Sequence, residues 1–247
     1  MNLGALAVAV APRAGGSGVA GLVQAGTDLS GQLAAGAAGG SSAVKIFLLI
    51  TALSFASALM MSVTCFTRII IVLSFLRQAL GTPQLPPNPV LMGLSLFLTM
   101  FIMAPVATRV HHDALGPYLD DKLPASEALE RGEKPLREWM LKQTREEDVR
   151  LFFEISGQAA PAARSEALPM TVVIPAFMVS ELGTAFRMGL YIFVPMLLID
   201  ILVASVLMSL GMMMVPPQMI SLPLKIGVFL LAGGWHLVVS SLVRSFG

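Results

Sequence analysis

Residues 188–210 read MGLYIFVPMLLIDILVASVLMSL, 23 positions with one ionisable side chain, Asp200. At 1.5 Å of rise per residue this run makes a helix of about 35 Å, enough to cross the roughly 30 Å hydrocarbon layer of a membrane. Three further apolar runs occupy residues 46–67, 90–108 and 226–243. We therefore expect an all-α, membrane-associated protein with four hydrophobic helical segments, some of them broken by proline.

The charged residues are concentrated in one part of the chain. Of the 31 Lys, Arg, Asp and Glu residues, nine bases and twelve acids lie between Arg109 and Glu166. The remainder is strongly apolar, and the whole chain has 55% hydrophobic residues and a mean hydropathy of +0.79. This partition is typical of a membrane-inserted chain with one water-exposed domain. The net charge of +1 gives no electrostatic basis for binding nucleic acid.

These patterns predict four regions. Residues 1–43 form a Gly/Ala-rich leader, which is either a secretory signal or a disordered segment. Residues 44–108 form a first hydrophobic helical hairpin, and residues 169–247 form a second one with a methionine-rich loop. Residues 109–168, named the polar domain below, form a helical extracytoplasmic domain between the two hairpins.

The orientation and the polar domain can be predicted in more detail. Arg68 and Arg77 follow the first segment without a nearby acid, so the positive-inside rule places their loop in the cytoplasm. An even number of spans then places the polar domain in the periplasm. Within it we expect two amphipathic helices. The first begins at Pro135, and the second begins at a capping box made by Thr144 and Glu147.

No sequence motif indicates chemistry. The chain has no GxxxxGK[ST] loop for nucleotide phosphates and no HExxH zinc motif. His111, His112 and Asp113 are adjacent, so a helix cannot turn all three toward one metal ion. We therefore expect a protein that is not an enzyme and that uses no cofactor and no metal ion.

Four ionisable residues lie in or beside the apolar runs: Arg68, Glu181, Asp200 and Lys225. An ionisable side chain inside such a span costs at least ~2.5–3.5 kcal/mol and is normally paired or lines water. With two bases and two acids present, we predict ion pairs between helices or between subunits. The alternative for Arg68 and Lys225 is that they lie at span ends and extend to lipid headgroups.

Residues 211–217 read GMMMVPP and are named the Met loop. The three consecutive residues Met212, Met213 and Met214 cannot share one helical face, and Pro216 and Pro217 prevent the helix from continuing. One interpretation is a tight apolar turn between two spans. The other is a deformable constriction that excludes water and ions but yields to a passing chain.

Several stretches resemble the FliP family of flagellar type III export-gate proteins. They are FTRIIIV at residues 66–72, LRQALGTP at residues 76–83, PAFMVSEL at residues 175–182 and the Met loop. The polar residues between 127 and 146 resemble the flagellar branch rather than the injectisome branch (SctR). The resemblance covers about residues 45–246. Gly233 departs from it, because an acidic residue often stands at that position.

The resemblance implies a pore-forming subunit that passes unfolded flagellar subunits across the bacterial inner membrane in the flagellar basal body. It implies a homopentamer completed by FliR-like and FliQ-like subunits, in contact with membrane lipid and with FlhB-like and FlhA-like export components. Met212, Met213 and Met214 would form the gate. Arg68, Glu181, Asp200 and Lys225 would be buried charges between subunits, and the helices would rise partly above the bilayer plane.

Two other functions remain open at this stage. A small secondary transporter or ion channel would use Glu181 and Asp200 as coupling-ion sites, and broken helices with carboxylates inside a span fit that function. An intramembrane enzyme is the second alternative, although no nucleophile and base can be named for it.

Overall fold

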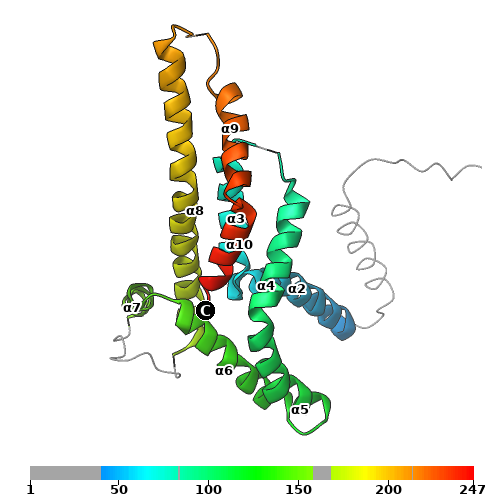
Figure 1. Ribbon diagram of the computed structural model, residues 1–247. Coiled ribbons are helices and arrows are strands. Elements are labelled where there is room, and N and C mark those ends of the chain that lie inside the picture. The colour runs from blue at the N-terminus through cyan, green and yellow to red at the C-terminus, as the bar shows by residue number, and fades with distance from the viewer. Residues whose placement is uncertain (1–39, 83, 158–167, 213) are drawn as a thin grey trace, which may run out of the picture. The chain divides into compact units, whose positions relative to one another are not determined.

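The computed structural model describes residues 40–82, 84–157, 168–212 and 214–247, and over these ranges it is helical without a strand (Figure 1). The all-α prediction is thereby confirmed. The elements in chain order are α2 (Gly40–Val63), α3 (Phe66–Ala79), α4 (Asn88–Val110), the π-helical turn η1 (His111–Leu115), α5 (Gly116–Leu119), α6 (Ala125–Gln143), α7 (Glu146–Ile155), α8 (Met170–Ser209), α9 (Gln218–Leu231) and α10 (Gly234–Arg244).

The chain divides into two compact units, Met1–Ala58 and Leu59–Gly247. The predicted leader, residues 1–43, belongs to the first unit and lies outside the described residues except for its last four positions. Helix α2 runs from the first unit into the second. All the other elements, and all the residues singled out from the sequence, belong to the second unit.

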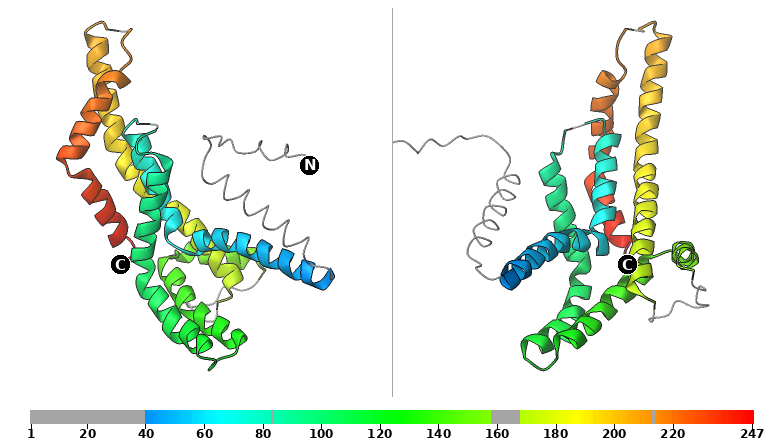
Figure 2. Two further views of the ribbon diagram at one scale, coloured as in Figure 1. Left: turned by 90° about the vertical axis from the view of Figure 1, so that its right-hand side faces the viewer. Right: turned by 180° about the vertical axis from the view of Figure 1, so that it is seen from behind.

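Helix α3 is the most buried element of the second unit. Ile69, Val72, Leu73 and Leu76 recur at helical spacing and are almost completely buried. They pack against α8 and α4, and Figure 2 shows α3 lying alongside α8. Burial of these four aliphatic side chains explains why the segment is a helix.

The sequence analysis placed Arg68 and Arg77 in a loop, and this prediction was wrong. Both residues lie in α3. The helix ends at Leu80 and the left-handed Gly81 (φ +74°), and Pro86 and Pro87 follow in the connection to α4. Two charges in a short segment suggested a loop, although the apolar residues between them already followed the helical period. The orientation in the membrane stays a prediction.

Within the described residues, two helical stretches are long and apolar enough to cross a membrane by length and composition. They are residues Asn88–Leu119, of 32 residues, and α8, of 40 residues. Helix α8 begins 18 positions before the run read from the sequence, and Pro175 and Pro195 lie inside it without ending it. Prolines within apolar helices are tolerated where neighbouring groups satisfy the freed carbonyls.

The last apolar run, residues 226–243, is not one straight helix. Helices α9 and α10 meet at an angle of 63°. Gly233 lies between them with φ +63°, a left-handed conformation that glycine adopts without the steric cost of a side chain. The pair counts as one broken span or as a re-entrant segment.

The polar domain contains α6 and α7, but neither helix begins where the sequence analysis placed it. Helix α6 begins at Ala125, so Pro135 lies inside it rather than at its start. The N-cap residue of α7 is Arg145, and the hydroxyl of Thr144 donates a hydrogen bond to the Met140 carbonyl (2.7 Å). The backbone N–H of Arg145 donates to Ser180 Oγ on α8 (2.8 Å). The start of α7 is therefore held by a contact with α8 and not by the predicted capping box.

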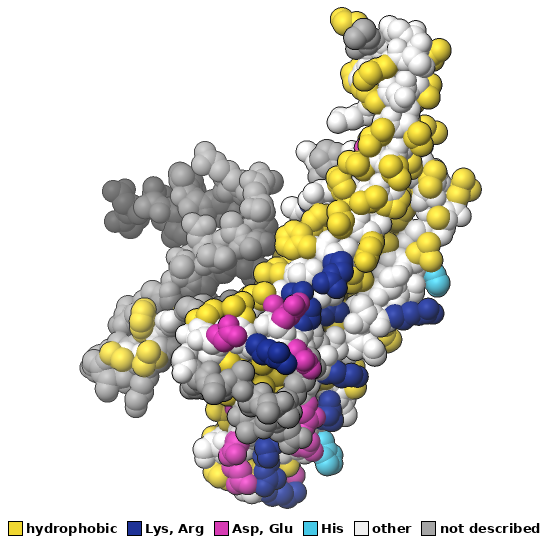
Figure 3. Space-filling model, turned by 90° about the vertical axis from the view of Figure 1, so that its left-hand side faces the viewer, with side chains coloured by type: hydrophobic (Ala, Val, Ile, Leu, Met, Phe, Trp, Pro, Cys, Tyr) yellow, Lys and Arg dark blue, Asp and Glu magenta, His cyan; other side chains and the backbone are white. Residues whose placement is uncertain are grey.

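The surface of the second unit divides in the same way as the sequence. Apolar side chains gather along α8 and its neighbours, and charged side chains gather over the polar helices (Figure 3). The exposed apolar residues of α8 include Leu190, Leu198 and Leu202. In a membrane-associated protein, lipid or other subunits cover such residues.

The packing of α3 on α8 depends on Gly189. A Cβ atom built there would lie 2.6 Å from Cγ of Phe75, whose ring also meets Phe186 edge-on (5.5 Å between centroids). We expect Gly189→Leu to lower the free energy of unfolding by about 1–3 kcal/mol through overpacking. The matched control is Gly227→Leu, because a Cβ at Gly227 meets nothing within 4 Å. Thermal unfolding in detergent measures both, and equal values for the two variants would contradict the α3–α8 contact.

Candidate functional site

The four charges singled out from the sequence form two ion pairs within one chain. The first joins Arg68 of α3 to Glu181 of α8. Arg68 Nε donates to Glu181 Oε2 (2.9 Å) and its Nη2 donates to Oε1, so the contact is bidentate. The two side chains are only 3% and 1% exposed. A bidentate guanidinium–carboxylate contact is the geometry in which a buried pair best satisfies both partners.

Arg68 also holds the C-terminal segment. Its Nη1 donates to the Ser245 carbonyl (3.1 Å) and contacts Ser245 Oγ (3.0 Å). Its guanidinium carbon lies 3.9 Å from the centre of the Phe246 ring, a cation–π contact. All three nitrogens of the guanidinium are therefore engaged, and α3, α8 and the end of the chain meet at one buried side chain.

The polar domain reaches the same place through α6. The rings of Trp139 and Phe246 are nearly parallel with centroids 6.4 Å apart, and Trp139 also meets Phe177 of α8 (5.3 Å). Gln143 Nε2 donates to the Phe246 carbonyl (3.1 Å). Trp139 and Gln143 of α6 thus hold Phe246, the residue whose ring lies against the Arg68 guanidinium.

The second pair joins Lys225 of α9 to Asp200 of α8. Lys225 Nζ donates to Asp200 Oδ2 (2.6 Å), and the lysine side chain is 7% exposed while that of Asp200 is 38% exposed. Both pairs therefore connect two helices of the same chain. The role of these residues between subunits, which the resemblance implies, stays a prediction.

The Met loop connects α8 to α9. Gly211 ends α8 with φ +74°, and the N–H groups of Gly211 and Met212 bond back to Met208 and Leu207 (both 3.0 Å). This is the usual way for a left-handed glycine to terminate a helix. Helix α9 begins only after Pro217, so the two prolines end up in the connection.

The described methionines of the loop point away from the chain's own core. Met214 is 95% exposed and Met212 is 48% exposed. Met213 lies outside the described residues. An apolar side chain with so little packing in its own chain is available for contacts outside that chain.

A family model described as the FliP family matches residues 49–242. The chain belongs to the FliP family. It is 51% identical over 206 residues to the flagellar biosynthetic protein FliP of Bacillus subtilis (strain 168), covering 83% of this chain and 93% of that protein. It is 53% identical over 203 residues to the protein of the same name from Pectobacterium carotovorum (82% and 78% covered), and 46% identical over 204 residues to that of Aquifex aeolicus (82% and 85%).

The sequence analysis of this FliP-family chain missed a polar contact beside the buried pair. Ser180 Oγ donates to Asp148 Oδ2 (2.5 Å), and Arg145 Nε donates to the same oxygen (2.9 Å). A Cβ at Gly183 would lie 2.8 Å from Nη2 of Arg145, so a larger residue there would displace the guanidinium. This contact fixes α7 on α8. The serine next to Glu181 was the one signal available in the sequence.

Arg187 was also passed over. It lies in α8, about one turn after Gly183, and is exposed. Gly233, the departure from the family pattern, has an explanation in the structure, because the left-handed bend between α9 and α10 favours glycine over an acid.

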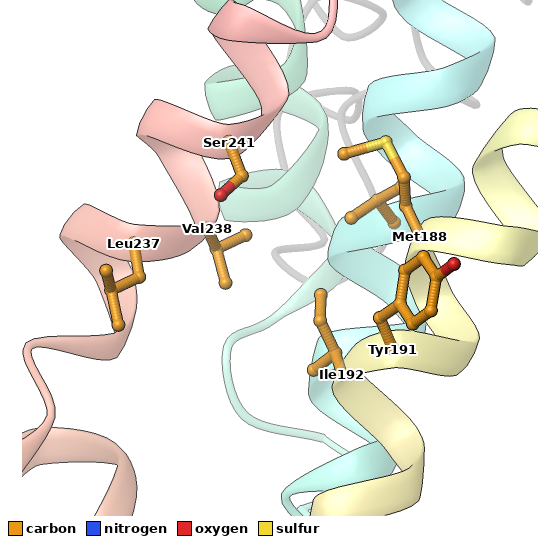
Figure 4. A pocket seen from close by; sticks show the side chains of 7 residues that line it. Met188, Tyr191, Ile192, Leu237, Val238 and Ser241 are labelled. Carbon is orange, nitrogen blue, oxygen red and sulfur yellow. The ribbon is translucent and has the colours of Figure 1, made fainter.

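A cleft of about 230 Å³ separates α10 from α8 and α3 (Figure 4). Leu237, Val238 and Ser241 form one wall, and Met188, Tyr191 and Ile192 form the other, so the lining is apolar apart from two hydroxyls. Among the described residues, no group of three His, Cys, Asp or Glu side chains could hold a metal ion. The cleft is therefore an apolar cavity with two hydroxyl groups in its lining.

The buried pair gives a test by substitution. Arg68→Ala leaves Glu181 buried without its partner, and we expect a loss of about 3–5 kcal/mol in unfolding free energy. The control is Arg109→Ala, which breaks a half-exposed pair with Glu138 (3.1 Å) and costs less than about 1 kcal/mol. The double variant Arg68→Met, Glu181→Met recovers part of the loss, since it removes both charges. Chemical denaturation in detergent gives all three values, and similar losses for Arg68→Ala and Arg109→Ala would contradict this assignment.

Proposed function

We propose that this chain is a pore-forming subunit of the flagellar type III protein export gate, through which unfolded flagellar subunits cross the bacterial inner membrane. The observation that carries the proposal is the Met loop at the end of the 40-residue α8, with Met214 almost fully exposed. The names of the relatives, which are flagellar biosynthetic proteins, support the flagellar part.

The Met loop acts as a gasket when several copies meet around an axis. Methionine is unbranched, has three rotatable side-chain bonds and fills irregular gaps. A ring of such side chains excludes water and hydrated ions, because an apolar constriction dewets. The same side chains change rotamer when an unfolded chain enters, and close behind it when it has passed. The loop needs no chemistry for this, and the energy comes from other parts of the export apparatus.

The assembly follows from the same proposal. We place the chain in the inner membrane with the polar domain in the periplasm, in a homopentamer completed by FliR-like and FliQ-like subunits. FlhB-like and FlhA-like components lie nearby. Exposed apolar residues on α4 and α8, such as Phe97, Phe101 and Leu202, supply the surfaces that lipid and neighbouring subunits cover.

The Arg68–Glu181 pair favours this function over the transporter. A coupling-ion site needs carboxylate oxygens free to bind a cation. Glu181 is held by Arg68 through both of its oxygens, whereas Lys225 holds Asp200 through one oxygen, Oδ2. Paired in this way, the two carboxylates fix the positions of α3 and α9 on α8, which suits a structural subunit.

Replacing Met212, Met213 and Met214 together with Ala shortens the side chains that would close the constriction. We expect a larger ion leak across the inner membrane, while secretion of flagellar subunits continues. Replacing them with Phe adds bulk and slows export. The control is Met92→Ala, an exposed methionine of α4. Membrane potential dyes and secretion assays in cells measure the two effects. Unchanged conductance in the triple Ala variant would contradict the gasket.

A further inference from the structure

The cleft that separates α10 from α8 and α3, named the α8–α10 cleft, is apolar and open to the surface. Met188 and Ser241 lie at one end of it, and Ile192 and Leu237 lie toward the other end (Figure 4). Tyr191 and Leu237 are 73% and 53% exposed. A cavity of about 230 Å³ that the chain's own side chains leave unfilled lacks dispersion contacts, and a hydrocarbon group restores them.

Two arginines stand at the end of the cleft where Met188 and Ser241 lie. Arg187 directly precedes Met188 in α8, and Arg244 follows Ser241 by one turn in α10. Both arginines are exposed. The next residue, Ser245, is bonded to the buried ion pair of α3 and α8, which keeps the end of α10 close to this part of α8.

The chain supplies no counterion for these two arginines. Within the described part of the chain, every other arginine makes an ion pair or a side-chain hydrogen bond, whereas Arg187 and Arg244 make neither. The acids of α8 are Glu181 and Asp200, and each already binds a base. A ligand that fits this end of the cleft therefore brings negative charge.

The two arginines also mark the edge of the apolar surface. Arg187 is the last ionisable residue before the apolar run 188–210, whose length matches the hydrocarbon layer of a membrane. Figure 3 shows Lys and Arg side chains gathered where the apolar surface along α8 meets the charged part. Helix α10 has 11 residues and is about 16 Å long, half of the hydrocarbon thickness. The cleft thus runs from the level of the headgroups into one leaflet.

We propose that the α8–α10 cleft binds one anionic phospholipid, with its phosphate against Arg187 and Arg244 and an acyl chain in the cleft. The planar donor arrangement of a guanidinium fits phosphate oxygens, and basic pockets between membrane helices bind anionic headgroups. The Ser241 hydroxyl supplies a donor for an ester oxygen of the same lipid. The bound lipid holds α10 against α8. The proposal requires the chain to lie in a membrane, but it does not require the pore of the proposed function.

Native mass spectrometry of the full-length chain in a neutral detergent tests the headgroup site. The two probes are phosphatidylglycerol and phosphatidylcholine with the same acyl chains. We expect phosphatidylglycerol to bind about tenfold more tightly, because choline cancels the charge of the phosphate in the other lipid. The double variant Arg187→Gln, Arg244→Gln loses this preference. The control is Arg131→Gln, which removes an exposed arginine paired with Glu127 (2.6 Å) in the polar domain and keeps the preference.

The cleft is tested separately from the headgroup site. Ser241→Trp fills the cleft, and we expect it to weaken the binding of both lipids by about tenfold, the effect of leaving about two methylene groups unburied. The control is Ser240→Trp, because the neighbouring Ser240 does not line this cleft. Equal losses in the two tryptophan variants would place the acyl chain elsewhere and overturn the proposal.

The remaining outcomes are equally decisive. Equal binding of the two lipids by the native chain overturns the proposal, and so does a preference that survives in the double arginine variant. Loss of an oligomer in that variant with an unchanged lipid preference also overturns it and assigns the arginines to an acidic group of another subunit. Both arginines are exposed, so we expect an unchanged unfolding temperature for the double variant. A native chain that is only monomeric in the same spectra overturns the proposed function and leaves the lipid site standing.

Discussion

The buried contact between Arg68 and Glu181 constrains the rest of the second unit. Two charges taken out of water are tolerated only when each satisfies the other and the remaining donors find acceptors. Here the remaining donors meet Ser245, and the guanidinium face meets Phe246. Helices α3 and α8, the polar helix α6 and the end of the chain must therefore all be in place together. A misplaced helix would leave an unpaired charge in the core, so the contact selects one arrangement among many apolar ones.

The molecule has an apolar part and a charged part. This division is visible in the sequence, on the surface and in the kinds of contact that hold each part. Apolar packing of Val72, Leu73 and Phe177 holds the helices around α3. Hydrogen bonds among Arg145, Asp148 and Ser180 hold the polar helix α7 on α8. Helix α8 belongs to both parts, because its first turns receive the polar domain and its last turn leads into the Met loop.

The sequence predicted the helical class, the apolar runs, the Met loop and the four charged residues that form pairs. Charge balance alone suggested that Glu181 and Asp200 pair with bases, but which base meets which acid depends on the packing of α3 and α9 on α8. The start of α7 could not be predicted from local capping, because Ser180 receives the N–H of Arg145 from 35 residues away. Helix α3 was missed because Arg68 and Arg77 resembled loop charges, whereas one of them is buried by contacts distant in sequence. Gly233 gave no signal beyond its departure from the family.

The length of α8 limits how this helix can lie in a membrane. Forty residues make a rod of about 60 Å, twice the hydrocarbon thickness of a bilayer. Fitting that rod inside the lipid would need a tilt of about 60°, against an average of roughly 20° for membrane helices. Nearly half of the helix must therefore stand outside the lipid, although it is apolar almost throughout. Within the chain, α3 and α7 cover the first half of the helix, where Val173, Phe177 and Ala185 are fully buried, whereas the exposed apolar residues Leu198, Leu202 and Met208 lie in the second half.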